Sequence, residues 1–119
     1  MSWQFDNSKP IYIQLVETLK LKIISGQLLA GNKLRSVRDL AEEAGVNPNT
    51  MQRALSELEK DQLVYSQRTS GRFVTEDMQL IQQAKNQYAT SKIKELTVAL
   101  LQIGYTKEEL LSLIEENLK

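Results

Sequence analysis

Two short amphipathic patterns separated by only three residues constrain the fold of this chain most strongly. SVRDLAEEAG opens with Ser36, a good N-cap, and closes with Gly45, a helix terminator. The next pattern starts at Asn47, a capping residue followed by Pro48 at the first helical position, and extends to about residue 61. Two short helices joined by a tight Gly-containing turn are typical of a helix-turn-helix, whose second helix enters the major groove of DNA.

The helix predicted after Asn47 has one apolar stripe and one polar face. At ~100° per residue, Met51, Leu55 and Leu58 fall on a single side and are expected to face the core. The opposite side carries amides, hydroxyls and cations, from Asn49, Gln52, Arg53, Ser56 and Lys60. Residues 44–56 include no acidic residue. Such a face is suited to phosphates and base edges, with an ordinary solvated helix surface as the alternative interpretation.

The net charge does not account for this face, because the chain has 15 basic and 15 acidic residues. What matters for nucleic-acid binding is whether the cations cluster. KLRSVR (33–38) holds three cations and no acid, and residues 62–75 hold two cations and no acid. These segments and residues 44–56 contain no acid, so the fold decides whether they share a surface.

The composition argues against several classes of function. The chain has no cysteine and no histidine, which removes thiolate nucleophiles, zinc–thiolate sites and the commonest general base. It also has no Gly-rich phosphate loop of the Walker or Rossmann type, so we expect no enzyme, no cofactor and no metal site. No apolar run approaches the ~20 residues of a membrane helix and no secretory signal opens the chain, which favours a cytoplasmic protein without membrane contact.

Further patterns flank the two short helices. A first helix that Gly26 should end is indicated by apolar residues at helical spacing, namely Tyr12, Leu15, Val16, Leu19 and Ile23. Lys33 and Leu34 then fit a very short strand. LVYSQ and RFVT alternate apolar and polar residues around Arg68 to Gly71, which predicts a β-hairpin with Gly71 supplying the positive φ of the turn. The expected fold is therefore mainly α with a small β-hairpin wing, a winged helix-turn-helix over residues 1–76.

In this order and spacing, the segments resemble the GntR family of bacterial transcription regulators. The matching pieces span about residues 9–76 and are PIYIQ, IISGQLLAGNKLRSVRDLAEEAGVNPNT, ALSELEKDQLVYS and SGRFV. The VNPNT turn and the short C-terminal part look most like the YtrA-like subgroup. The resemblance implies a sequence-specific DNA-binding regulator, and a repressor that occludes a promoter is the form we expect.

The family's DNA-contacting positions can be carried over one at a time. They match Arg38 on the second helix, Asn47, Pro48, Asn49, Thr50 and Gln52 around the start of the recognition helix, and Ser70 and Gly71 at the wing tip. Pro48 stands where many members have an arginine, and Arg35 stands where a proline is usual and adds a candidate phosphate contact. The full DNA-binding set that we expect is Arg35, Ser36, Arg38, Asn47, Pro48, Asn49, Thr50, Gln52, Arg53, Arg68, Thr69, Ser70, Gly71 and Arg72.

Three arginines of this set have a plainer interpretation. Arg38 could pair with Glu42 one turn further along the helix. Arg68 and Arg72 could serve only to keep the tip of a hairpin in water. A winged helix can also act as a protein-interaction module, which the zero net charge of the chain favours slightly.

Residues 77–119 contain a long amphipathic helical pattern and a short one. Gly104 and Tyr105 break the pattern, and Thr106 with Glu109 forms a capping box that opens the second helix. Two such helices bury little apolar surface alone and need either the winged domain or a second copy of the chain. The resemblance implies the second copy: a homodimerisation segment, with two recognition helices one helical turn (~34 Å) or a multiple apart on a palindromic site. The residues identify no small-molecule effector.

Overall fold

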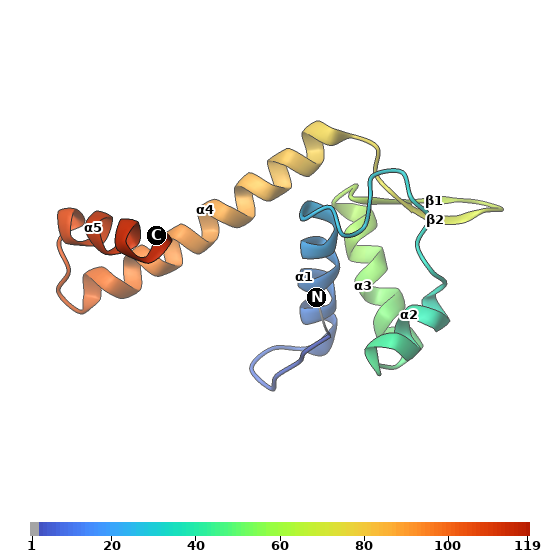
Figure 1. Ribbon diagram of the computed structural model, residues 1–119. Coiled ribbons are helices and arrows are strands. Elements are labelled where there is room, and N and C mark those ends of the chain that lie inside the picture. Colours follow the sequence, from blue (N-terminus) through green and yellow to red (C-terminus); the bar gives the residue numbers. More distant parts are fainter. Residues whose placement is uncertain (1–2) are drawn as a thin grey trace. The chain divides into compact units, whose positions relative to one another are not determined.

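The computed structural model describes residues 3–119 and divides into two compact units, the first ending at Ala84 and the second running from Lys85 to Lys119. The order of elements along the chain is α1 (Ile11–Ile24), α2 (Val37–Ala44), α3 (Pro48–Lys60), β1 (Val64–Gln67), β2 (Gly71–Val74), α4 (Met78–Gln102) and α5 (Lys107–Leu118) (Figure 1). This architecture confirms the expected fold class, mainly α with one small antiparallel hairpin.

The core of the first unit forms where α3 packs against α1 and α2. The predicted apolar stripe of α3 is confirmed, because Met51, Leu55 and Leu58 are almost completely buried. They join a single cluster with buried side chains of the other elements, including Leu15, Leu19, Ile23, Leu40, Leu63, Val64 and Val74. Burial of each such side chain is worth about 1.5–3 kcal/mol, so this cluster fixes the orientation of α3 relative to its two neighbours.

Local capping sets the tight turn between α2 and α3. The Ser36 hydroxyl accepts a hydrogen bond from the Asp39 backbone N–H at 3.1 Å, which caps α2. Gly45 ends α2 with a φ of 72°, a left-handed conformation that glycine adopts without strain. The side chain of Asn47 accepts from the Asn49 backbone N–H at 2.7 Å and Pro48 begins α3. The helix-turn-helix predicted from these four residues is therefore confirmed.

The hairpin pairs β1 with β2, and Val64 lies opposite Val74 while Gln67 lies opposite Gly71. Gly71 has a φ of 105°, as the predicted turn requires. The short strand expected at residue 33 is present as an isolated bridge between Lys33 and Phe73, next to a 2.8 Å hydrogen bond from the Leu34 N–H to the Arg72 carbonyl. This bridge attaches the segment leading into α2 to the edge of the hairpin.

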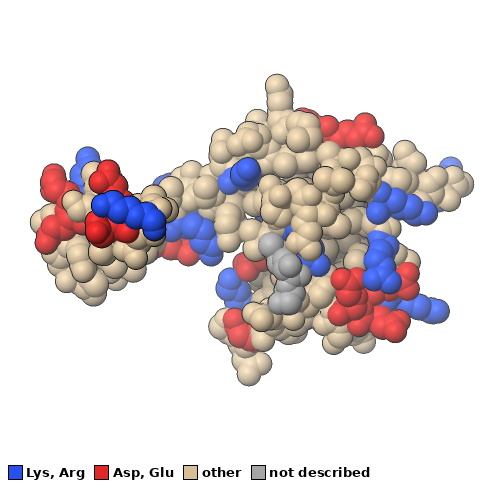
Figure 2. All heavy atoms as spheres, in the orientation of Figure 1, with Lys and Arg blue, Asp and Glu red and all other residues tan. Residues whose placement is uncertain are grey.

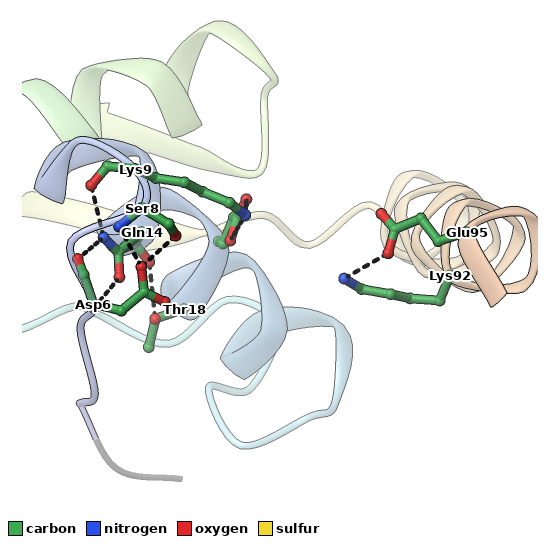
Figure 3. A network of polar contacts seen from close by, with 8 residues as sticks. Asp6, Ser8, Lys9, Gln14, Thr18, Lys92 and Glu95 are labelled. Atoms are coloured by element: carbon green, nitrogen blue, oxygen red, sulfur yellow. Dashed lines mark hydrogen bonds and ion pairs between the residues drawn. The ribbon is translucent and has the colours of Figure 1, made fainter. Parts of the chain in front are cut away.

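The residues before α1 are held by the side chain of Gln14, which is buried. Its amide nitrogen donates to the carbonyls of Asp6 and Lys9, each at 2.8 Å, and its amide oxygen accepts from the Asp6 N–H at 2.9 Å (Figure 3). Pro10 lies outside the helix as its N-cap residue. These contacts fix the approach of the chain to α1.

Helix α4 starts in the first unit, where Ile81 is buried in the core cluster and Leu80 and Ala84 pack against it. The first unit thus reaches eight residues beyond residue 76, where the sequence analysis ended the winged domain. In the second unit, a reciprocal capping box opens α5: the Glu109 N–H donates to the Thr106 hydroxyl at 3.1 Å and the Thr106 N–H donates to the Glu109 carboxylate at 3.0 Å.

The second unit leaves most of its apolar side chains in contact with solvent. Within residues 85–119, Leu110 alone is buried. The exposed large apolar residues are Tyr88, Ile93, Leu96, Val98, Leu101, Ile103, Leu111, Leu113, Ile114 and Leu118. No helix formed by residues 3–119 is both long and apolar enough to cross a bilayer.

Candidate nucleic-acid interface

The outer face of α3, defined here as Asn49, Gln52, Arg53, Ser56 and Lys60, has two edges that touch different parts of the first unit. At one edge, Glu59 contacts the hairpin. At the other edge, the guanidinium of Arg53 lies over the ring of Tyr12 on α1, 3.6 Å from the ring centroid. Asn49 and Gln52 are exposed and Ser56 is half-buried, with a weak 3.4 Å hydrogen bond from Gln52 to Ser56. The middle of this face therefore carries amides and a hydroxyl and no charged partner.

The carboxylate of Glu59 connects the hairpin to α3. Glu59 accepts from the Ser66 hydroxyl and from Arg72 Nε, each at 2.6 Å. The Ser66 hydrogen bond is the largest influence that holds the pKa of Glu59 below its ordinary value, and Arg72 lowers the pKa further through its own hydrogen bond and charge. The side chain of Arg72 is only 20% exposed. Arg72, which the sequence predicts as a phosphate contact, is thus engaged inside the first unit.

A groove runs between the segment leading into α2 and the hairpin turn. It is lined by residues 33–37 on one side and residues 66–72 on the other. Seven predicted site residues from two separate segments meet here, namely Arg35, Ser36, Arg68, Thr69, Ser70, Gly71 and Arg72. The groove also contains Lys33, which the sequence analysis did not select, although KLRSVR had been singled out for its cations.

The placement of Lys33 depends on the fold. The bridge to Phe73 holds the Lys33 backbone beside β2. Its side chain then lies against the turn, because a Cβ placed on Gly71 would be 3.2 Å from Lys33 Cε. No local pattern in the sequence brings residue 33 to residue 71, whereas the strand pairing does.

Arg35 is exposed but has an acidic partner. Its guanidinium donates to one oxygen of Glu43 at 2.7 Å, and the indole N–H of Trp3 donates to the other oxygen at 3.1 Å. The Trp3 hydrogen bond is the main influence that holds the pKa of Glu43 below its ordinary value, with Arg35 acting in the same direction. Because exposed ion pairs are worth about 0–1 kcal/mol, Arg35 can exchange this carboxylate for a phosphate at small cost.

Four exposed cations in the described part of the first unit lack an acidic partner. Ion pairs engage Lys9, Lys20, Arg35, Lys60 and Arg72, and Lys22 is buried over the Trp3 ring. Within residues 3–76, the cations not paired with a carboxylate and not buried are Lys33, Arg38, Arg53 and Arg68. They come from the segment leading into α2, from α2, from α3 and from the hairpin turn.

The distribution of charge over the hairpin follows from this. The free end of the hairpin shows blue atoms and no red ones in the view of Figure 2, while α2 carries both colours. Glu42, the alternative partner considered for Arg38, makes no ion pair with it in the part of the chain that the structure describes. Arg38 and Arg68 therefore present uncompensated charge to solvent.

The remaining predicted residues lie at the starts of α2 and α3. Ser36 and Asn47 use their side-chain oxygens as helix caps, and both are exposed. Pro48 is exposed at the start of α3, and Thr50 is half-buried. Capping holds the first turns of α2 and α3 at the surface, where helix N-termini favour phosphate.

The chain is similar to known regulators over this unit and beyond it. Residues 11–74 match the family described as "Bacterial regulatory proteins, gntR family". The regulator YhcF of Bacillus subtilis, described as an uncharacterized HTH-type transcriptional regulator, is 36% identical over 93% of this chain and 92% of its own length. The HTH-type transcriptional repressor YtrA of the same organism is 31% identical over 92% of this chain and 85% of its own length.

Solved structures show the same similarity. A GntR family transcriptional regulator from Listeria monocytogenes superposes with a TM-score of 0.89 at 38% identity, over 94% of this chain and 98% of that protein. AraR(DBD) in complex with operator ORX1 matches 60% of this chain and 93% of that chain, with a TM-score of 0.56 at 27% identity. The family match, the relatives and the winged helix-turn-helix geometry agree: this chain belongs to the GntR family of bacterial transcription regulators and carries its DNA-binding domain.

Proposed function

We propose that this chain is a transcriptional repressor that binds a palindromic operator as a homodimer. The observation that carries the proposal is the set of uncompensated cations Lys33, Arg38, Arg53 and Arg68 on the elements that surround the outer face of α3. The names of two relatives agree with it, since YtrA is a repressor and AraR(DBD) binds an operator. A regulator of this kind works on the chromosome, so we assign it to the cytoplasm.

Affinity and specificity come from different residues in this proposal. Lys33, Arg35, Arg38 and Arg68 neutralise phosphates, with Ser36, Thr69, Ser70 and Gly71 adding contacts to the backbone beside them. Asn49 and Gln52 read base edges, because they are exposed amides of the outer face of α3. Asn47, Pro48 and Thr50 place the first turn of α3 against the DNA. Arg72 acts through Glu59 by holding the hairpin.

The homodimer is assigned to the second of the two parts proposed from the sequence, residues 77–119. Ile93 and Leu96 lie along one stripe of α4, and Ile103 follows directly after the end of this helix. Leu111, Ile114 and Leu118 lie along one stripe of α5, and all of these side chains are exposed in a single chain. An apolar surface of this extent is a marker of an interface. A second copy of the chain satisfies it and gives the two-fold symmetry that a palindromic operator requires.

The first test is selection of bound duplexes from a random DNA pool at ~150 mM salt, near physiological ionic strength, followed by sequencing. Enrichment of an inverted repeat supports DNA reading and dimerisation together. Enrichment of a single half-site supports sequence-specific DNA binding and contradicts the proposed dimer. If no sequence is enriched at this salt, or if duplex DNA binds weakly and without sequence preference, the proposal is wrong. The winged helix is then a protein-interaction module.

A matched pair of variants separates specific contacts from general charge. Arg38→Gln removes an uncompensated cation of α2, and Lys85→Gln removes one exposed cation of the second unit. Both change the net charge equally. The proposal expects weaker binding to the selected operator for Arg38→Gln and unchanged binding for Lys85→Gln.

A further inference from the structure

The contact between Tyr12 and Arg53 joins the N-terminal part of α1 to the outer face of α3. Arg53 Cζ lies 3.6 Å from the centroid of the Tyr12 ring, within the range of a cation–π contact. Tyr12 is half-buried, so packing fixes its ring. Arg53 is exposed, and its guanidinium is restrained by the contact with this ring and not by burial. A ring face restrains the position of a guanidinium without engaging its five N–H donors in conventional hydrogen bonds.

The donors of Arg53 are not consumed by an acid. Glu57 lies one turn further along α3, in reach of an i,i+4 pair, but its carboxylate pairs with Lys60 at 3.1 Å. No carboxylate forms an ion pair with Arg53 anywhere in residues 3–119. The guanidinium is therefore held in place and keeps its hydrogen-bonding capacity and its charge.

The edge on which Arg53 lies determines what it can reach. Glu59, which marks the hairpin side of α3, and Arg53 are six residues apart, which at ~100° per residue separates them by about 120° around the helix. The major groove is about 12 Å wide, and an α-helix with its side chains is about 10–12 Å across. A helix that fills the groove turns its two edges toward opposite phosphate backbones. The phosphate backbone on the hairpin side is within reach of the cations between the segment leading into α2 and the hairpin turn, namely Lys33, Arg35 and Arg68. The opposite backbone is then left to Arg53.

We propose that Tyr12 is a positioning residue that holds Arg53 for a phosphate contact on the backbone opposite the wing. This inference rests on the proposed function and refines it, since Arg53 supplies affinity and not base preference. Arg53 is the DNA-contacting residue, and Tyr12 acts only through it. The first unit then has cations for both phosphate backbones, and the outer face of α3 has amides for the bases between them.

The test measures operator binding as a function of salt for Arg53→Gln, Tyr12→Leu, Tyr12→Phe and the double variant Tyr12→Leu/Arg53→Gln, using the duplex selected from the random pool. Arg53→Gln should reduce the salt slope by about 1 for each protomer bound, and so by about 2 for the proposed homodimer, because each protomer loses one phosphate-neutralising cation. It should weaken binding by the same factor for the operator and for its one-base variants. Tyr12→Leu should weaken binding by most of the same amount, and Tyr12→Phe, which keeps the ring, should behave as the wild type.

The double variant distinguishes positioning from a structural role. If Tyr12 acts through Arg53, Tyr12→Leu should have no further effect on operator binding once Arg53 is glutamine. A purely structural role would weaken binding equally in both backgrounds, and that result would overturn the inference. So would a change of base preference at one operator position in Arg53→Gln, because it would make Arg53 a base reader. A wild-type protein that selects no operator rejects the proposed function itself, and the inference with it.

Discussion

Arg72 Nε and Glu59 Oε1 lie 2.6 Å apart, and this contact connects the hairpin to the last turn of α3. Ser66 on the other strand donates to the same oxygen, so both strands of the wing depend on one carboxylate. The wing and α3 are the two elements expected to contact DNA at the same time. Their relative orientation therefore depends on a residue that touches no DNA.

Glu59→Gln should destabilise the first unit by about 1 kcal/mol, because hydrogen bonds to a charged group contribute about 1.5–3 kcal/mol and the amide can keep part of the contact. Urea unfolding at a fixed protein concentration measures the loss. Glu57→Gln is the matched control: it removes a neighbouring carboxylate whose pair with Lys60 is exposed, and should cost less than about 0.5 kcal/mol. Equal losses in the two variants would show that Glu59 is an ordinary surface acid.

The effect of Glu59 should disappear in acid. Ser66 and Arg72 hold its pKa below the ordinary value in the folded state. A carboxylate of this kind stabilises the fold above its unfolded pKa of about 4.3, and that stabilisation is lost as the pH falls through the folded value. The stability difference between the wild type and Glu59→Gln should therefore be full at pH 7, shrink as the pH falls below the unfolded pKa, and close once the pH is below the lowered folded pKa. A difference that persists in acid would mean that the carboxylate charge is not its source.

Local signals made most of the fold predictable from the sequence. Ser36, Asn47 and Thr106 cap helices through bonds that span two or three residues, and Gly71 meets a requirement of its own turn. The apolar stripe of α3 follows from helical periodicity alone. Each of these features depends on residues close in sequence, and the structure confirms them.

The sequence could not predict which cations of the site are free. Arg72 is engaged by Glu59, thirteen residues away, and Arg35 by a carboxylate that also accepts from Trp3. The Arg53–Tyr12 contact joins two different helices. These pairings depend on how the elements pack and carry no periodic signal. The sequence alone therefore predicts the same role, a DNA contact, for every arginine of the set.

The uncompensated cation of the hairpin turn should act on affinity and not on specificity. Arg68→Gln should weaken operator binding by the same factor for the operator and for one-base variants, and should reduce the salt slope by about 1 for each phosphate that Arg68 neutralises. Titrations at several salt concentrations measure both quantities. Arg72→Gln provides the contrast, since Arg72 already pairs with Glu59. It should alter stability more than the salt slope, and a reversed pattern would contradict this division of roles.

Gln52 should contribute to base reading. Its amide is exposed on the outer face of α3, and an amide can pair bidentately with adenine. Gln52→Ala should lower discrimination by ~1–3 kcal/mol at one position of each half-site and leave the salt slope unchanged. Repeating the selection from a random pool with the variant protein measures this directly. Ser56→Ala, which removes the weak partner of Gln52, is the control for the intramolecular hydrogen bond. An unchanged base preference in Gln52→Ala would remove Gln52 from the reading set.

The exposed stripe of α5 should be the most sensitive part of the proposed dimer. Ile114 is exposed in the single chain and lies between Leu111 and Leu118 on one face of the helix, so a dimer built on this stripe would bury all three. Ile114→Glu would place a charge in that interface, where its desolvation is not compensated. We expect the variant to be a folded monomer by light scattering. Its operator binding should weaken, because the two half-sites would then be bound separately.

Ser112→Glu is the control for this prediction, because it adds the same side chain to another face of the same helix. This variant should remain a dimer with unchanged binding. If the wild type is itself a monomer, or if both variants dissociate equally, the stripe is not the contact between copies, and the palindromic operator loses its structural basis.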